Sequence, residues 1–96
     1  MVYFTVRCDP LPGKEEEFDG FLADKAKKFW TGQQGVKSFH VYGDKLAGWP
    51  ERTIMIEVQD LGSLQKILDS DERKRLRKEF MTYTARSESQ IQDPIV

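Results

Sequence analysis

Near its start the chain reads Val2-Tyr3-Phe4-Thr5-Val6-Arg7-Cys8, and apolar and polar side chains largely alternate along this stretch. Successive side chains of a β-strand point to opposite faces of a sheet, so the pattern predicts a strand with one buried and one uncovered face. The residues that follow, Asp9-Pro10-Leu11-Pro12-Gly13, are expected to end it, because proline lacks a backbone donor and disfavours helix in the residue before it.

A helix is predicted next, because apolar residues recur at helical spacing from Phe18 to Trp30, with glutamates before them and lysines near their end. Its aromatic stripe either packs in the core or lines a cavity for a planar ligand. Two alternating runs, Val36–Tyr42 and Arg52–Val58, predict two strands. The turn-rich connection Gly43–Pro50 between them predicts a hairpin with a long loop.

A second helical region is expected to begin at Asp60 as a cap and to restart at a capping box formed by Asp69 and Glu72. A mostly polar strand, Ala85–Gln92, ends the pattern. The order strand, helix, strand, strand, helix, strand predicts an α+β, ferredoxin-like βαββαβ domain over residues 1–96, with a four-stranded antiparallel sheet and both helices on one face.

The uncovered face of this sheet is more apolar than a fully solvated face needs to be. We therefore expect a second copy of the chain to cover it, which makes the protein a homodimer. The residues expected in this interface combine tyrosine, methionine and charged side chains: Tyr3, Arg7, Tyr42, Met55 and Glu57. Glu57 shares this face with Arg7 and His40, so either an Arg7–Glu57 ion pair or a His40–Glu57 pair fits there, and the ion pair is the more ordinary of the two.

Composition narrows the classes of function. The 96 residues, 39% of them hydrophobic, suit one domain with an ordinary core. Fifteen basic against sixteen acidic residues give a net charge of -1, so nucleic-acid binding is not expected. One cysteine, Cys8, and one histidine leave no ligand set for zinc, so neither a metal nor a cofactor is expected. No apolar run approaches a membrane span and no signal peptide is recognisable, so a cytoplasmic protein is expected.

Two charged or titratable features, His40 and the basic run Arg73–Lys78, are candidates for a functional role. His40, the single histidine, is either a general base or an ordinary surface or interface residue, because an imidazole titrates near neutral pH but needs oriented partners to act. The basic run Arg73–Lys78 suggests nucleic acid or an anionic ligand. Acidic neighbours almost balance it, however, so we interpret it as the solvated face of a helix with internal ion pairs.

Three short segments resemble the dimeric α/β-barrel superfamily, and its antibiotic-biosynthesis-monooxygenase-like and stress-responsive branches in particular. They are Pro12-Gly13-Lys14, Gly35-Val36-Lys37-Ser38-Phe39 and Asp60-Leu61-Gly62-Ser63-Leu64. The resemblance implies a homodimer in which two sheets meet to form a barrel, often with a small-molecule pocket between each sheet and its helices. The haem-degrading branch uses an asparagine and a histidine on its second helix. This chain has no asparagine, and its region Leu61–Thr84 has no histidine, so haem degradation is not carried over.

The oxygenase branch implies a cofactor-independent monooxygenase that acts on a small aromatic molecule such as a phenol or quinol. His40 is then the candidate base, and Tyr42, Trp49 and Arg86 are the candidate substrate-binding residues. The alternative is a dimer that binds a small ligand without catalysis or serves a structural purpose, because a fold does not determine the chemistry of its site.

Overall fold

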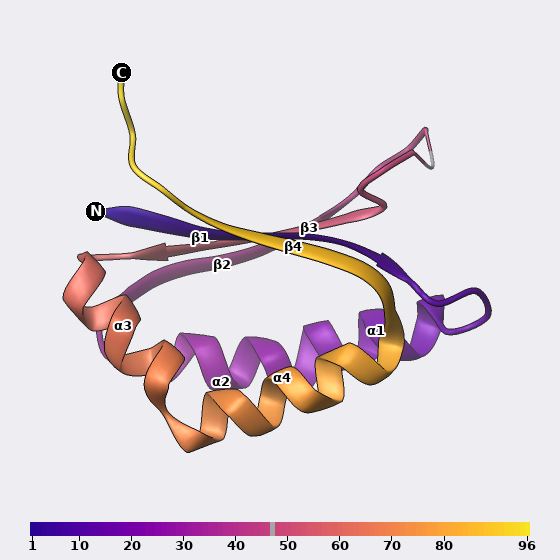
Figure 1. Ribbon diagram of the computed structural model, residues 1–96, viewed down its shortest axis with the longest axis horizontal. Helices are drawn as coiled ribbons and strands as arrows, with labels where there is room; N and C mark the ends of the chain where they lie inside the picture. The colour runs from indigo at the N-terminus through magenta and orange to yellow at the C-terminus, as the bar shows by residue number, and fades with distance from the viewer. Residues whose placement is uncertain (47) are drawn as a thin grey trace.

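The computed structural model describes residues 1–46 and 48–96, which form one four-stranded antiparallel sheet with the helices on a single face (Figure 1). The strands, in the sheet order β2-β3-β1-β4, have these bounds: β1 Val2–Pro10, β2 Val36–Gly43, β3 Arg52–Val58 and β4 Thr84–Gln92. The helical segments have these: α1 Glu15–Phe21, η1 Leu22–Ala26, α2 Lys27–Thr31, α3 Leu61–Asp69 and α4 Asp71–Tyr83. The predicted ferredoxin-like order is confirmed. None of the described helices has the length and apolar character that crossing a membrane requires.

The first strand lies inside the sheet, between β3 and β4. Phe4 is paired with Ile56 on β3 and with Ile91 on β4, so all three share the face that the helices cover. The predicted alternation holds along β1 and β3, whose helix-facing side chains are almost fully buried: Val2, Phe4, Val6, Cys8, Ile54, Ile56 and Val58. The core therefore lies between the sheet and the helices, as the sequence predicted.

The first strand is longer than predicted, because it continues to Pro10 instead of ending at Cys8. Pro10 is paired with Thr84 across a shift of register that falls between Asp9 and Pro10. An irregular strand end tolerates a residue without a backbone donor, and this explains why the proline does not end the strand earlier. The hairpin prediction is confirmed for β2 and β3. Ala47, in the connection between them, lies outside the described residues.

Short polar side chains cap the N-termini of α3 and α4. The Asp60 carboxylate accepts a hydrogen bond from the backbone N–H of Ser63 at 2.7 Å, which confirms the predicted cap of α3. The predicted capping box at Asp69 is wrong by one residue. Asp69 still belongs to α3, and the Ser70 hydroxyl caps α4 by accepting from the backbone N–H of Arg73 at 3.2 Å.

The first helical segment contains a feature that the sequence did not predict. Leu22–Ala26 forms a π-helical turn, η1, between α1 and α2, so the segment is not one uniform α-helix. Such turns accommodate one extra residue and are frequent at functional sites. Leu22 and Ala26, which bound η1, are both buried against the sheet.

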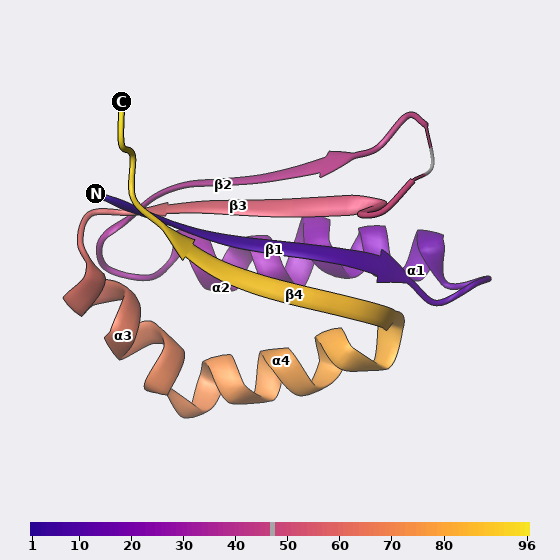
Figure 2. The same cartoon turned by 45° about the horizontal axis from the view of Figure 1, so that its top comes forward.

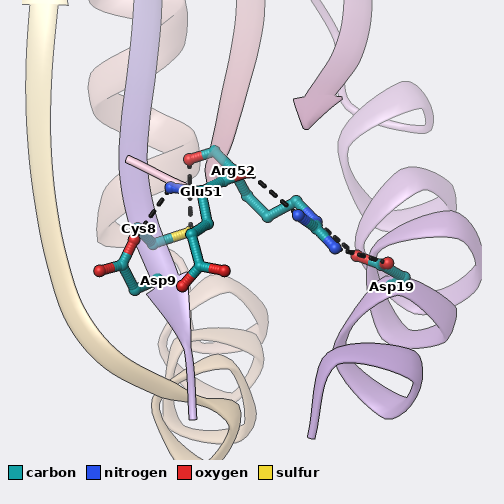
Figure 3. A network of polar contacts seen from close by, with 5 residues as sticks. All are labelled: Cys8, Asp9, Asp19, Glu51 and Arg52. Atoms are coloured by element: carbon teal, nitrogen blue, oxygen red, sulfur yellow. Dashed lines mark hydrogen bonds and ion pairs between the residues drawn. The ribbon is translucent and has the colours of Figure 1, made fainter. Parts of the chain in front are cut away.

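A polar network joins α1 to the start of β3 (Figure 3). The Arg52 guanidinium binds both carboxylate oxygens of Asp19, at 2.8 and 3.0 Å. Asp9 accepts from the backbone N–H of Glu51 at 2.9 Å. Burial raises the pKa of the neighbouring Cys8 thiol to about 12, so the thiol keeps its proton, and its Sγ lies 3.8 Å from the Arg52 carbonyl oxygen as a weak donor. The Arg52–Asp19 pair therefore ties the first helix to the sheet, and the other two contacts join β1 to the start of β3.

Candidate functional site

A cavity of about 220 Å³ lies between the sheet and the helices. Its walls come from all four strands and from α1, the π-helical turn η1, α2 and α4. They are rich in aromatic rings, contributed by Phe4, Phe21, Trp30, Phe39 and Phe80. An engineered apolar cavity of about 150 Å³ binds benzene in other proteins, so this space suits a molecule of one or two rings.

The cavity has an apolar interior and one polar side. Its polar lining residues come from two elements only: Arg73 and Arg77 from α4, and Ser87 and Ser89 from β4. These two elements also provide the exposed lining residues, whereas the lining residues of β1, β3 and η1 are buried. The cavity therefore opens between α4 and β4, which run side by side along one edge of the domain in Figure 2.

Two positive charges flank this opening. The Arg73 guanidinium lies 5.8 Å from the centre of the Phe4 ring, a cation–π distance. Loss of solvent, and then repulsion from Arg77, lowers the pKa of the Arg73 guanidinium, which nonetheless stays a cation in water. Within the described part of the chain, neither arginine forms an ion pair with a carboxylate.

The interpretation of the basic run as a solvated face holds for Lys74, Arg75, Arg77 and Lys78, which are exposed, but not for the half-buried Arg73. The described ion pairs include none within α4, and Glu79 pairs instead with Lys25 of η1 at 3.0 Å. The sequence held a signal that points to the cavity: Arg73 and Arg77 recur with Leu76 and Phe80 at i, i+3, i+4 and i+7, which places them on one helix face. Both arginines were missed as site residues because the run was weighed by its total charge.

His40 lies on the other face of the sheet. It is paired with Met55, shares the uncovered face with it, and is exposed. Its ring stacks with that of Tyr42, with 6.1 Å between the ring centres. His40 does not line the cavity, so its predicted role as a base stays a prediction that the cavity geometry does not support.

The three candidate substrate-binding residues lie near one another, but away from the cavity. The Arg86 guanidinium lies over the Trp49 ring, 3.8 Å from its centre. Tyr42 and Trp49 line a separate, shallow hollow together with Pro50 and Thr53. None of the three lines the cavity between the sheet and the helices, and their predicted role in binding remains a prediction.

The residues predicted for the dimer interface share the uncovered face, where their polar groups pair within one chain. The Tyr3 hydroxyl donates to the Glu57 carboxylate at 2.9 Å, and this bond raises the pKa of the Tyr3 phenol. Arg7 lies 4.0 Å from the carboxylate of Glu88 on β4. The arginine–glutamate pair expected between Arg7 and Glu57 is therefore not the pairing within the chain.

Comparison with known proteins places the fold. No family model matches the chain, and no curated protein matches its sequence. Solved structures match it closely in shape. They include SnoaB, a cofactor-independent oxygenase from Streptomyces nogalater, with a TM-score of 0.83 at 16% identity, covering 97% of this chain and 91% of that one.

Two further solved structures share the architecture. One is a putative antibiotic biosynthesis monooxygenase from Bordetella bronchiseptica, with a TM-score of 0.83 at 15% identity over 99% of this chain and 97% of that one. The other is At3g17210 from Arabidopsis thaliana, with a TM-score of 0.87 at 10% identity over 100% and 97%. The chain thus has the ferredoxin-like fold found in antibiotic biosynthesis monooxygenase-like proteins.

Proposed function

We propose that this chain is a homodimeric, cofactor-independent monooxygenase that oxidises a small phenol or quinol in the cavity beneath its sheet. The observation that carries the proposal is the cavity of about 220 Å³, whose aromatic walls lead to two guanidinium groups. A mostly apolar pocket with a few convergent polar groups is the usual form of a small-molecule site. SnoaB, which has the same fold, supports the choice of reaction class.

For a phenol, the proposed reaction consumes one dioxygen and needs no external reductant. The phenolate gives one electron to dioxygen, and the resulting radical and superoxide combine to form a carbon–oxygen bond at the ring. The peroxide O–O bond then breaks as the same carbon loses its proton. One oxygen atom stays on the product as a quinone carbonyl, and the other leaves as water, so phenol and dioxygen balance quinone and water.

The chain's own residues contribute position and electrostatics to this reaction. Phe4, Phe21 and Trp30 hold the ring in a site with little water, where charges interact more strongly than in bulk solvent. Arg73 and Arg77 stabilise the negative charge on the substrate oxygen, which lowers the barrier to forming the electron-rich anion. In this scheme the substrate proton passes to solvent at the cavity opening, since the lining includes no carboxylate or imidazole among the described residues.

The homodimer is proposed on the uncovered face of the sheet. Tyr42 there is 54% exposed, a large aromatic ring that a single chain leaves open to solvent. Several polar groups of this face already have partners, as in the hydrogen bond of 2.8 Å from Thr5 to Gln92. A second copy can therefore cover the face without stranding those groups, because buried polar atoms are tolerated when they are hydrogen-bonded.

Oxygen consumption tests the proposed activity. The purified protein would be given a panel of phenols and quinols, with an oxygen electrode recording uptake and mass spectrometry in ¹⁸O₂ detecting one labelled oxygen in the quinone product. We expect catalysed uptake that depends on protein concentration. Uptake no faster than that of the substrate in buffer, across the whole panel, would refute the proposed reaction.

A second candidate function is a dimer that binds an aromatic ligand without transforming it. One observation favours it: no acidic residue and no histidine among the described residues lines the cavity, so no general base lies within reach of a bound ligand there. Saturable binding of a phenol with no oxygen uptake would favour this candidate.

A further inference from the structure

We infer that the cavity takes its ligand as an anion: an aromatic molecule of one or two rings whose ionised oxygen lies against Arg73 and Arg77. The inference deepens the proposed function, on which it rests for the reaction, by naming the charge state and substrate class that the site selects. The claim that the cavity binds an anion follows from the positions of its lining residues and does not depend on the reaction.

The cavity separates an apolar end from a cationic end. Trp30 and Phe21 are each 5% exposed and line its buried part, where the body of an apolar ring fits well. Phe4, also 5% exposed, lies where the two ends meet, because the Arg73 guanidinium is 5.8 Å from its ring centre. The guanidinium groups come from the other side, along α4. A ligand with its ring inside and its charge outward satisfies both ends at once.

Among the described residues, neither guanidinium has a carboxylate partner that a ligand would have to displace. The described ion pairs leave out both arginines, whereas Arg52 is bound to Asp19 by two hydrogen bonds. Arg73 is half-buried beside a second cation, an arrangement that costs free energy until an anion relieves it. The planar guanidinium also offers paired donors that match a carboxylate or a phenolate oxygen.

The serines add neutral donors on the opposite side of the opening. Ser87 and Ser89 lie on β4 at positions paired with Cys8 and Val6, so their side chains share the helix-covered face of the sheet. Their hydroxyl groups can donate to an oxygen that Arg73 or Arg77 also binds. The four side chains thus place donors, and no carboxylate, around one end of an apolar space.

A matched pair of probes tests the charge preference: 2-naphthoate and 2-naphthamide have nearly the same shape, but only the first is an anion. Isothermal titration calorimetry at low salt should give a Kd about tenfold lower for 2-naphthoate, since charge-assisted hydrogen bonds are roughly twice as strong as neutral ones. The preference should shrink as salt is added. Equal affinity for the two probes, or no binding of either, would overturn the inference.

Substitution identifies the residues responsible. Arg73→Gln should weaken 2-naphthoate binding about tenfold and leave the Kd for 2-naphthamide unchanged, which also shows that the cavity is intact. The matched control is Lys78→Gln, because it removes one positive charge from the exposed side of the same helix and Lys78 does not line the cavity. Equal effects of the two substitutions would mean that only the general charge of the helix matters, contrary to the inference.

A second probe separates this inference from the proposed reaction. The phenolate form of 4-nitrophenol absorbs visible light, so its binding to the two arginines at a slightly acid pH should increase that absorbance. Arg73→Gln should abolish the increase. An increase with no oxygen uptake from any phenol supports the inference and refutes the reaction, whereas oxygen uptake without any anion preference supports the reaction and refutes the inference.

Discussion

The two faces of the sheet differ in how their side chains are covered and paired. On the helix-covered face the side chains are almost all apolar, yet they border a cavity of about 220 Å³. Two arginines flank its opening, and neither belongs to an ion pair among the described residues. On the uncovered face the side chains are mixed, and several pair within the sheet, as Tyr3 does with Glu57. The covered face has room for a small ligand, and the uncovered face is the one proposed to bind a second copy of the chain. The same strands supply both, because their side chains alternate.

The largest expected effect comes from removing a side chain of α1 from the core that packs under the covered face. Phe18 has no exposed surface and its ring lies 5.6 Å from that of Phe80, centre to centre. Phe18→Ala should lower the free energy of unfolding by about 3–5 kcal/mol, through lost burial and the void left behind. Urea denaturation followed by circular dichroism measures this loss.

The comparison variant is Tyr42→Ala on the uncovered face. We expect it to cost about 1 kcal/mol or less, since the Tyr42 side chain is mostly exposed in one chain. Both variants should be measured at several protein concentrations, because unfolding coupled to dissociation depends on concentration. If Tyr42→Ala costs as much as Phe18→Ala at every concentration, the uncovered face is a second core and the contrast between the faces is lost.

The second prediction breaks the proposed dimer. Met55 lies on β3, directly between Thr5 of β1 and His40 of β2, in the middle of the uncovered face. Met55→Glu should raise the dimer Kd about 100-fold or more, because a carboxylate would lose its water against a partly apolar partner surface. Sedimentation equilibrium gives the Kd.

A control substitution places the same change elsewhere. Leu61 is 52% exposed at the start of α3, where a negative charge suits the helix N-terminus. Leu61→Glu should leave the dimer Kd within about twofold of the original, as expected for an exposed position away from an interface. A wild-type protein that sediments as a monomer would contradict the proposed dimer.

The sequence predicted which side chains lie on each face of the sheet better than it predicted which residues line the cavity. Alternation from Val2 to Cys8 assigned the buried face of β1 correctly, because a period of two has one interpretation in a strand. Asp60 was recognisable as a cap because its side chain is short and a helical pattern follows it. Such features depend on local residues and were therefore accessible without a structure.

The site depends on features that local patterns do not contain. The π-helical turn at Leu22–Ala26 has no recognisable sequence signature, yet it bounds the cavity. Arg73 was read as solvated because a charge is usually exposed. Its side chain is long enough for the guanidinium to reach the Phe4 ring, 5.8 Å from the ring centre. The empty space itself follows from the distance between α4 and the sheet, which no residue type encodes.

The third prediction concerns a substitution that fills the cavity under the covered face. Ala26 lines it from η1, so Ala26→Leu should place extra carbon atoms in the empty space. We expect 2-naphthoate binding to weaken about tenfold through lost room, with the thermal midpoint unchanged or raised, because filling a void restores packing contacts. The control is Ala23→Leu, an exposed position on the same helical turn that does not line the cavity. Equal loss of binding in both would show that the ligand lies elsewhere.

The smallest expected effect concerns His40, because its substitution tests on which face of the sheet the reaction takes place. The sequence suggested it as a general base, but its ring lies beside Tyr42 on the uncovered face, with the sheet between it and the cavity. If the reaction takes place in the cavity, His40→Gln should change oxygen uptake less than about twofold, whereas loss of a general base costs about 100-fold or more. Arg73→Gln, measured in parallel, should lower the rate substantially. A 100-fold loss in His40→Gln, together with a pH profile that loses the ionisation of an imidazole, would place the chemistry on the uncovered face. That outcome would also require the second chain to leave His40 accessible to substrate, so it would refute the cavity as the catalytic site and the proposed interface together.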